Sequence, residues 1–206
     1  MNYYIDFDNT LYNTQLLKNK ILDSMVTLII EKNNLNYASV YKECEDKFHR
    51  QYVSNIHELA NYFANKYNID LNTVINNLNT VILNSEDLVF ADCIPFLKKL
   101  KENGHKVYLL SFCKYGPEFQ TIKIAGSKLT TFFDGLYITC IPKYNLEIDY
   151  TNGIFIDDNP DDLLGLYLKN PKQVIRLRRK GTTHSEKNIN NQNIKEYSTF
   201  NEIDVA

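Results

Sequence analysis

Two clusters of aspartates could bind a cation and carry out acid–base chemistry. The first is the pair Asp6 and Asp8, and the second contains Asp157, Asp158 and Asp162. Two like charges about 4 Å apart cost on the order of 4 kcal/mol at an effective dielectric of about 20, so carboxylates that meet require a cation or raised pKa values. Donor sets made only of oxygen atoms favour magnesium. The two clusters therefore predict a Mg²⁺ site, provided that the fold brings them together.

Each cluster follows a short apolar segment that has the character of a buried strand. Residues 2–7 are rich in aromatic side chains and stop at Asp8, and residues 153–157 end at Asp157. Because side chains alternate along a strand, we expect Asp6 and Asp8 to point the same way. Ligands of open parallel sheets bind at the carboxyl ends of the strands, so both clusters are expected at that edge.

Two more polar residues follow expected strands. Ser111 ends the apolar segment 106–111, and Lys143 lies in the loop after segment 135–139. A hydroxyl donor and an ammonium group beside a carboxylate–magnesium cluster would hold and neutralise a phosphoryl group. Together these residues predict a phosphate-binding site.

The rest of the chain divides into a helical block and an alternating block. Residues 14–88 contain no glycine or proline, and their apolar residues recur at helical spacing between asparagine-rich breaks. We expect a long first helix and further helices near 41–52, 56–67 and 71–83. After Asp92 helices and strands alternate, which is typical of an α/β fold with a parallel sheet. The strands expected in this sheet are 2–7, 106–111, 135–139, 153–157 and 173–177.

Taken in order, these motifs resemble those of the haloacid dehalogenase-like hydrolases. The first motif of that family, D-x-D-x-T, is matched by I-D-F-D-N-T-L at residues 5–11, and the second by Ser111 in V-Y-L-L-S. Lys143 matches the third motif, and F-I-D-D-N-P-D-D matches the acidic fourth motif. The resemblance spans roughly residues 2–177. It implies a doubly wound parallel-sheet (Rossmann-like) core of residues 1–13 and 89–206, with a small α-helical cap domain at 14–88.

The resemblance also implies a role for each motif residue. Asp6 would be the nucleophile that forms an aspartyl-phosphate, and Asp8 would be the general acid and then the general base. Ser111 and Lys143 would bind the phosphoryl group. Because Lys143 lies close before Asp157 in the chain, Lys123 or Lys128 could take its place.

The metal site implied by the resemblance draws on both acidic clusters. Mg²⁺ would be held by Asp6, by the backbone carbonyl of Asp8 and by Asp158, with Asp157 and Asp162 as a further ligand or as neighbours of the ligands. Dehalogenases of the family lack an acid at the position of Asp8, whereas its phosphatases and phosphotransferases carry one.

The resulting prediction is a magnesium-dependent phosphatase that hydrolyses a small phosphate monoester. Two alternatives stay open, namely a phosphomutase or phosphotransferase that uses the same site, and a non-catalytic module that binds metal or phosphate. Sugar phosphates, nucleotides and phosphoglycolate are all compatible with the motifs. Specificity is expected to reside in the cap, with Lys47, Arg50 and Lys66 as candidates.

The composition narrows the choice of binding partners and of cellular compartment. Lys and Arg total 23 against 25 Asp and Glu, a balance that gives no bias toward nucleic acid or an anionic membrane. The expected partner is a small phosphorylated metabolite, and the oligomeric state is open. The start of the chain has no signal-peptide pattern, so a cytoplasmic protein is expected. The four widely spaced cysteines, Cys44, Cys93, Cys113 and Cys140, are expected to be reduced thiols.

Three further expectations concern residues outside the motifs. The four histidines, His184 among them, share no ligand spacing and are expected on the surface or on helix faces. The basic run from Arg176 to Lys180 is expected to be a solvated strand edge. The polar residues 180–195 are expected to form a mobile loop before a short C-terminal element.

Overall fold

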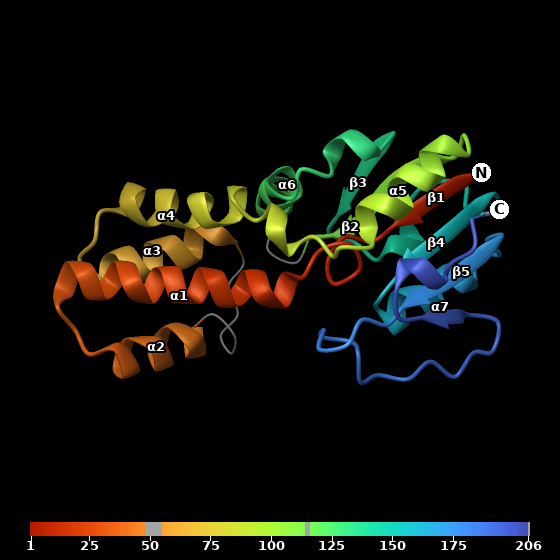
Figure 1. Cartoon of the computed structure of the whole chain (residues 1–206). Coiled ribbons are helices and arrows are strands. Elements are labelled where there is room, and N and C mark those ends of the chain that lie inside the picture. Colours follow the sequence, from red (N-terminus) through yellow and green to blue (C-terminus); the bar gives the residue numbers. More distant parts are fainter. Residues whose placement is uncertain (48–54, 114–115, 206) are drawn as a thin grey trace.

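The structure is a computed structural model that describes residues 1–47, 55–113 and 116–205. Its centre is a parallel sheet of six strands in the order β3-β2-β1-β4-β5-β6 (Figure 1). The strands are β1 (Asn2–Ile5), β2 (Lys106–Phe112), β3 (Gly135–Thr139), β4 (Gly153–Asp157), β5 (Gln173–Leu177) and β6 (Lys195–Tyr197). The five expected strands are confirmed, and β6 is an addition that the sequence did not predict.

The strand order places a ligand crevice beside β1. The chain runs outward from β1 through β2 to β3, and then returns to β4 on the other side of β1. Ile5 of β1 pairs with Leu109 on one side and Ile156 on the other. Because loops diverge where the order reverses, the carboxyl ends of β1 and β4 form the crevice where open α/β sheets bind their ligands.

Helices and loops cover both faces of the sheet, which confirms the doubly wound α/β core. On one face Ile5 and Ile156 belong to the same core as Leu97 of α5 (Cys93–Glu102). On the other face Phe155 packs with Leu166 of α7 (Pro160–Tyr167). The alternation of strand side chains therefore buries apolar groups in both directions.

In the described part of the block that the sequence predicted to be helical, the structure has four α-helices: α1 (Thr14–Asn33), α2 (Tyr37–Glu45), α3 (Ile56–Tyr67) and α4 (Leu71–Leu83). They gather beyond the end of the sheet toward which β1 runs, as a cap domain would (Figure 1). The stripe Leu17, Ile21 and Met25 of α1 is buried against the other helices. The division into a core of 1–13 and 89–206 and a cap of 14–88 stays a prediction.

The breaks between these helices contain asparagine and aspartate residues that cap the helix ends. Asn55 accepts a hydrogen bond from the Glu58 amide at the start of α3, and Asp70 does the same for Thr73 in α4. Asn34 and Asn68 end α1 and α3 in the left-handed conformation, which asparagine tolerates better than most residues. The structure confirms the expected helices 56–67 and 71–83, and these capping residues explain where the two helices begin. The expected helix 41–52 begins earlier, at Tyr37, and its residues beyond 47 lie outside the described part of the chain.

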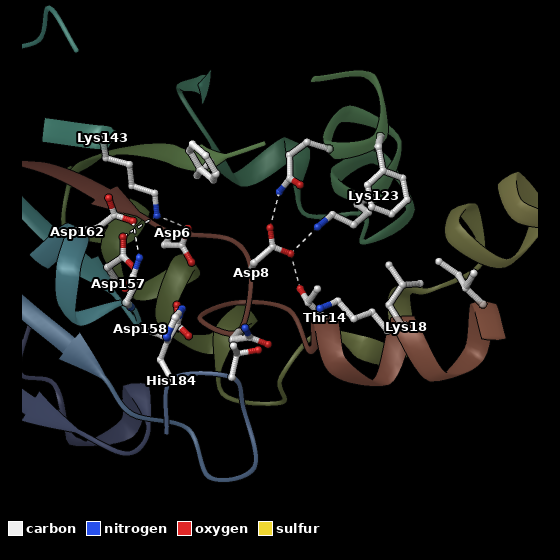
Figure 2. A pocket seen from close by; sticks show the side chains of 18 of the residues that line it. Asp6, Asp8, Thr14, Lys18, Lys123, Lys143, Asp157, Asp158, Asp162 and His184 are labelled. Atoms are coloured by element: carbon white, nitrogen blue, oxygen red, sulfur yellow. Dashed lines mark hydrogen bonds and ion pairs between the residues drawn. The ribbon is translucent and has the colours of Figure 1, made fainter. Parts of the chain in front are cut away.

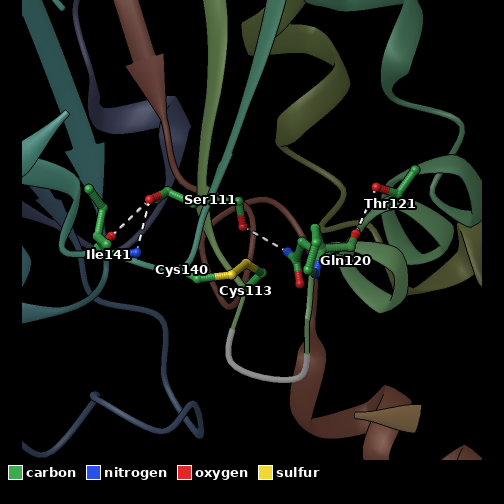
Figure 3. Close-up of a disulfide and its surroundings, with 8 residues drawn as sticks. Ser111, Cys113, Gln120, Thr121, Cys140 and Ile141 are labelled. Atoms are coloured by element: carbon green, nitrogen blue, oxygen red, sulfur yellow. Dashed lines mark hydrogen bonds between the residues drawn. A yellow bond between two sulfur atoms is a disulfide. The ribbon is translucent and has the colours of Figure 1, made fainter. Parts of the chain in front are cut away.

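The expectation of four reduced cysteines is wrong for two of them. Cys113 and Cys140 form a disulfide, with their Cα atoms 5.2 Å apart (Figure 3). Strands β2 and β3 pair as far as Phe112 and Thr139, so the next residue of each strand is a cysteine beside a cysteine. This pairing depends on which residue of β2 lies beside which residue of β3. The two cysteines are 27 residues apart along the chain, so the sequence alone does not show that they are neighbours. Cys44 and Cys93 are buried thiols.

The expectation of a solvated basic edge is wrong for Arg176 and Arg179, whereas Lys180 is exposed as expected. Strand β6 covers β5, so Arg176 is fully buried and donates to Glu196 and to the carbonyl of His184. Arg179 is buried as well and donates two hydrogen bonds to Asp92. The segment 180–195 was expected to be a mobile loop. Its Thr182 and Ser185 are buried, and the carbonyls of His184 and Ser185 accept hydrogen bonds from Arg176 and Arg178. Among the described helices, none has the length and apolar character that crossing a membrane requires.

Candidate active site

Three buried aspartates meet at the carboxyl ends of β1 and β4 (Figure 2). Asp6 follows β1, Asp157 ends β4, and Asp158 follows it. One carboxylate oxygen of each lies within 4.8 Å of the other two. The backbone amide of Asp6 donates to the carbonyl of Ile156 at 2.8 Å, which fixes the two strand ends side by side. Asp6 of the first acidic cluster therefore meets Asp157 and Asp158 of the second, as expected, whereas Asp8 is not part of this group.

Lys143 lies between two of these carboxylates. Its Nζ is 2.5 Å from Asp6 and 2.6 Å from Asp157, and its side chain is only 3% exposed. It begins the short helical turn η4 (Lys143–Asn145), whose first carbonyl accepts a hydrogen bond from the Tyr150 hydroxyl. Burial favours the neutral amine, but the Asp157 and Asp6 carboxylates outweigh burial and raise the pKa of Lys143. Of the three lysines considered from the sequence, Lys143 is therefore the one that contacts Asp6, while Lys128 is exposed.

The same three aspartates offer carboxylate oxygens that could serve as the ligands of a divalent cation. Burial, together with the neighbouring carboxylates, raises the pKa of Asp6 and of Asp158. Among the described residues, nothing donates a hydrogen bond to the buried Oδ2 of Asp158. An orphaned buried oxygen in a cluster of carboxylates fits a hard cation such as Mg²⁺.

The residues next to this cluster fit supporting roles. Both oxygens of Asp157 are already engaged, one by Lys143 and the other by the backbone amide of Asn159. Asp162 accepts a hydrogen bond from the Asn159 side chain. Asp6 and Asp158 are accordingly the better direct ligands, and Asp157 and Asp162 are better suited to orient their neighbours.

Asp8 belongs to a second, separate ion-pair cluster. Its two oxygens accept hydrogen bonds from Lys123 Nζ at 2.5 Å, from Gln120 Nε2 at 2.8 Å and from the Thr14 hydroxyl. Lys123 and Gln120 come from α6 (Pro117–Gly126), and Thr14 begins α1 (Figure 2). Burial alone would raise the pKa of Asp8, but the Lys123 ammonium and these hydrogen bonds outweigh it, so the pKa lies below its ordinary value.

Ser111 lies one hydrogen bond away from this cluster. Its hydroxyl is fully buried at the end of β2 and accepts a hydrogen bond from Gln120 Nε2 at 2.7 Å (Figure 3). Gln120 therefore bridges Ser111 and Asp8. Ser111 is not among the described residues that line the cavity, so its predicted contact with a phosphoryl group stays a prediction.

A cavity of about 220 Å³ joins the two clusters and extends toward the helical block. Asp6, Asp8 and Lys143 line its floor. Of the seven described residues that the helical block contributes to its wall, four are apolar, namely Leu17, Ile21, Ile56 and Leu59, and the others are Thr14, Lys18 and Asn55. The site therefore opens to a space that could hold a small organic group.

The candidate specificity lysines do not line this cavity. Lys47 lies 4.4 Å from the centre of the Tyr62 ring, and Lys66 pairs with Glu43. Arg50 lies outside the described residues. Lys18, which the sequence did not single out, lines the cavity.

Two other cavity residues, Gln120 and His184, were missed by sequence reasoning, and Lys123 was considered only as a substitute for Lys143. Gln120 and Lys123 lie three residues apart on one face of α6, a spacing that could have drawn attention to them. His184 lines the cavity, so its expected place on the surface or on a helix face is wrong. It sits in an irregular segment between β5 and β6, where no periodicity in the sequence could indicate which way it faces.

The fold of the chain is similar to that of known structures. A haloacid dehalogenase (HAD) phosphatase from Thermococcus onnurineus is 17% identical with a TM-score of 0.64, and the match covers 98% of this chain and 94% of that one. The HAD-hydrolase YfnB from Bacillus subtilis, bound to magnesium, is 14% identical with a TM-score of 0.60, covering 98% and 95%. A haloacid dehalogenase-like hydrolase from Burkholderia xenovorans is 15% identical with a TM-score of 0.70, covering 97% and 92%.

Two dehalogenase structures match as well, with TM-scores of 0.54 and 0.57. No protein-family model and no curated protein sequence matches this chain. The fold is that of the haloacid dehalogenase-like hydrolases, which confirms the fold that the motif resemblance implied.

Proposed function

We propose that this protein is a magnesium-dependent phosphatase that hydrolyses a small phosphate monoester. The observation that carries the proposal is the cluster of Asp6, Asp157 and Asp158 with the Lys143 ammonium inserted in it and one Asp158 oxygen unpaired. The magnesium-bound YfnB and the HAD phosphatase, which share the fold, support the same assignment.

The presence of Asp8 favours phosphoryl transfer over dehalogenation. Its carboxyl group lines the same cavity as Asp6, so a second group that can exchange a proton lies in the cavity of the nucleophile. Breaking a P–O bond leaves an alkoxide that must take up a proton, whereas a departing halide needs none. A second carboxylate in this position is therefore useful for an ester and not for a haloacid.

The reaction follows from these positions. Asp8 has to enter this half of the reaction protonated: an oxygen of Asp6 attacks phosphorus, the bond from phosphorus to the leaving oxygen breaks, and the Asp8 carboxyl group gives its proton to that oxygen. In the second half, Asp8 takes a proton from water, the water oxygen attacks phosphorus, and phosphate leaves Asp6. Lys143 orients Asp6 and neutralises charge on the phosphoryl oxygens. Mg²⁺, held by Asp6, Asp158 and the Asp8 carbonyl, would offset the remaining negative charge of the phosphoryl group.

The test is hydrolysis of p-nitrophenyl phosphate and a panel of natural monoesters by wild type and Asp6→Asn, with Mg²⁺ and with chelator. We expect magnesium-dependent turnover that falls by at least about 10³-fold in Asp6→Asn. Asp161→Asn is the matched control, because Asp161 lies in the same acidic motif but is 79% exposed. Acid quenching is expected to trap phosphate on the peptide that contains Asp6.

Failure has a clear form. If folded wild type with saturating Mg²⁺ turns over no phosphate ester, the phosphatase proposal is refuted. An added alcohol acceptor separates hydrolysis from phosphotransfer, and a 2-haloalkanoic acid tests the activity of the dehalogenases that share this fold. Halide release without phosphate release would also contradict the proposal.

A further inference from the structure

The helix α6 contributes two buried polar side chains to the site, neither of which belongs to the four motifs. Gln120 Nε2 donates to Asp8 Oδ2 at 2.8 Å and to the Ser111 hydroxyl at 2.7 Å. Lys123 Nζ donates to Asp8 Oδ1 at 2.5 Å. The Lys123 side chain is 4% exposed, whereas that of Asp8 is 25% exposed. The pair thus consists of a buried cation and a carboxylate that faces the cavity.

A buried ion pair of this kind contributes little to the stability of the fold. Removing an ammonium group from water carries a desolvation penalty that the attraction of one carboxylate often fails to recover. Lys123 is desolvated at a place where apolar packing would be the simpler choice, between the rings of Phe7 and Phe119, whose centres lie 5.8 and 5.4 Å from its Nζ. The benefit is geometric, because donors on both oxygens of Asp8 fix the rotation of its carboxylate.

We propose that Lys123 and Gln120 are positioning residues, which hold the Asp8 carboxylate in the orientation that proton transfer to the leaving group requires. The inference rests on the proposed phosphatase function. It adds α6 to the elements that build the site. Through the Gln120 bridge it also couples Asp8 to Ser111.

The leaving group of the substrate reports on this role. The p-nitrophenolate ion is a weak base and departs with little help from an acid, whereas an alkoxide depends on protonation as its bond to phosphorus breaks. The value of kcat/KM includes every step up to the departure of the leaving group. A misoriented Asp8 should therefore lower kcat/KM for an alkyl phosphate more than for p-nitrophenyl phosphate.

The experiment compares n-butyl phosphate with p-nitrophenyl phosphate in wild type, Lys123→Met, Lys123→Arg and Gln120→Leu. Because losing the Lys123 ammonium also raises the pKa of Asp8, each kcat/KM is taken at the pH optimum of its variant. We expect the ratio of the two kcat/KM values, alkyl over aryl, to fall at least about tenfold in Lys123→Met. Gln120→Leu should lower the ratio less, because it removes only a neutral donor. Lys123→Arg keeps a cationic donor and should recover part of the ratio. Lys98→Met, at an exposed lysine of α5, is the matched control and should leave the ratio unchanged.

Thermal unfolding of each variant shows whether it is folded, and Gln120→Leu still tests the inference if Lys123→Met is not. Equal losses on both esters, or an unchanged ratio in both Lys123→Met and Gln120→Leu, would overturn the positioning role while leaving the phosphatase proposal intact. Absence of turnover in wild type would overturn the proposed function and this inference with it.

Discussion

Removing the disulfide between Cys113 and Cys140 should lower stability by a predictable amount. The bond joins the ends of β2 and β3, two residues after Ser111 and three before Lys143. It closes a loop that contains α6 and β3. The double variant Cys113→Ser/Cys140→Ser removes the bond with little change in side-chain volume, so the main effect is on the unfolded chain.

The size of the effect follows from the length of that loop. For a separation of 27 residues, the entropy lost by closing the loop in the unfolded chain corresponds to about 3.6 kcal/mol at 25 °C. In a chain of 206 residues each kcal/mol changes the melting temperature by about 2–4 °C, so we expect a fall of about 7–14 °C.

The assay is thermal unfolding of wild type and the double variant, each with and without a dithiol reductant. Reductant should lower the melting temperature of wild type to near that of the double variant and should leave the double variant unchanged. Alkylation in denaturant should label two cysteines, Cys44 and Cys93, in unreduced wild type and four after reduction. Four labelled cysteines before reduction would refute the pairing of Cys113 with Cys140. A melting temperature of wild type that does not change with reductant would refute the stability argument.

Three further predictions concern the acidic cluster. Burial and neighbouring carboxylates raise the pKa of Asp6, so the folded state binds a proton more tightly than the unfolded chain; without metal, stability should fall as pH rises from about 4 to 8. Mg²⁺ should accordingly raise the melting temperature more at pH 8 than at pH 5, and an equal rise at both would contradict this. Lys143→Met leaves Asp6 and Asp157 buried without their cation and should lower the free energy of unfolding by about 3–5 kcal/mol in urea titrations with chelator. Adding Asp157→Asn should restore part of that loss, and no restoration would argue against charge as the cause. Asp158→Asn should weaken Mg²⁺ binding in calorimetric titrations by at least the roughly 10–100-fold that the loss of a residue neighbouring a ligand causes, whereas unchanged affinity would exclude Asp158 as a ligand.

The site residues that the sequence predicted share a simple local signal. Asp6, Ser111 and Asp157 each stand at the end of an apolar segment, and in a parallel sheet such ends share one edge. No knowledge of strand pairing is needed to place them together. Helices α3 and α4 could be predicted from the sequence equally well, because Asn55 and Asp70 mark their first turns.

The features that sequence reasoning missed depend on contacts between distant segments. The bond between Cys113 and Cys140 requires the register of β2 against β3. The burial of Arg176 requires β6, a strand of three residues with no apolar alternation to reveal it. The contact of Lys123 with Asp8 requires the angle at which α6 leaves the sheet. Each is a consequence of tertiary packing, on which local composition has little influence.

The balance of charge in the cavity indicates the order in which it would be filled. The described residues that line it include five carboxyl groups and three lysines. With every carboxyl group ionised, as metal binding requires, and His184 neutral, they leave a formal charge of −2: Asp6, Asp8, Asp157, Asp158 and Asp162 against Lys18, Lys123 and Lys143. A phosphate monoester dianion would meet repulsion in such a cavity. One divalent cation cancels the excess, and the unpaired oxygen of Asp158 is the place that no lysine serves. Metal binding should therefore precede and enable substrate binding, so that Mg²⁺ acts on KM as well as on kcat.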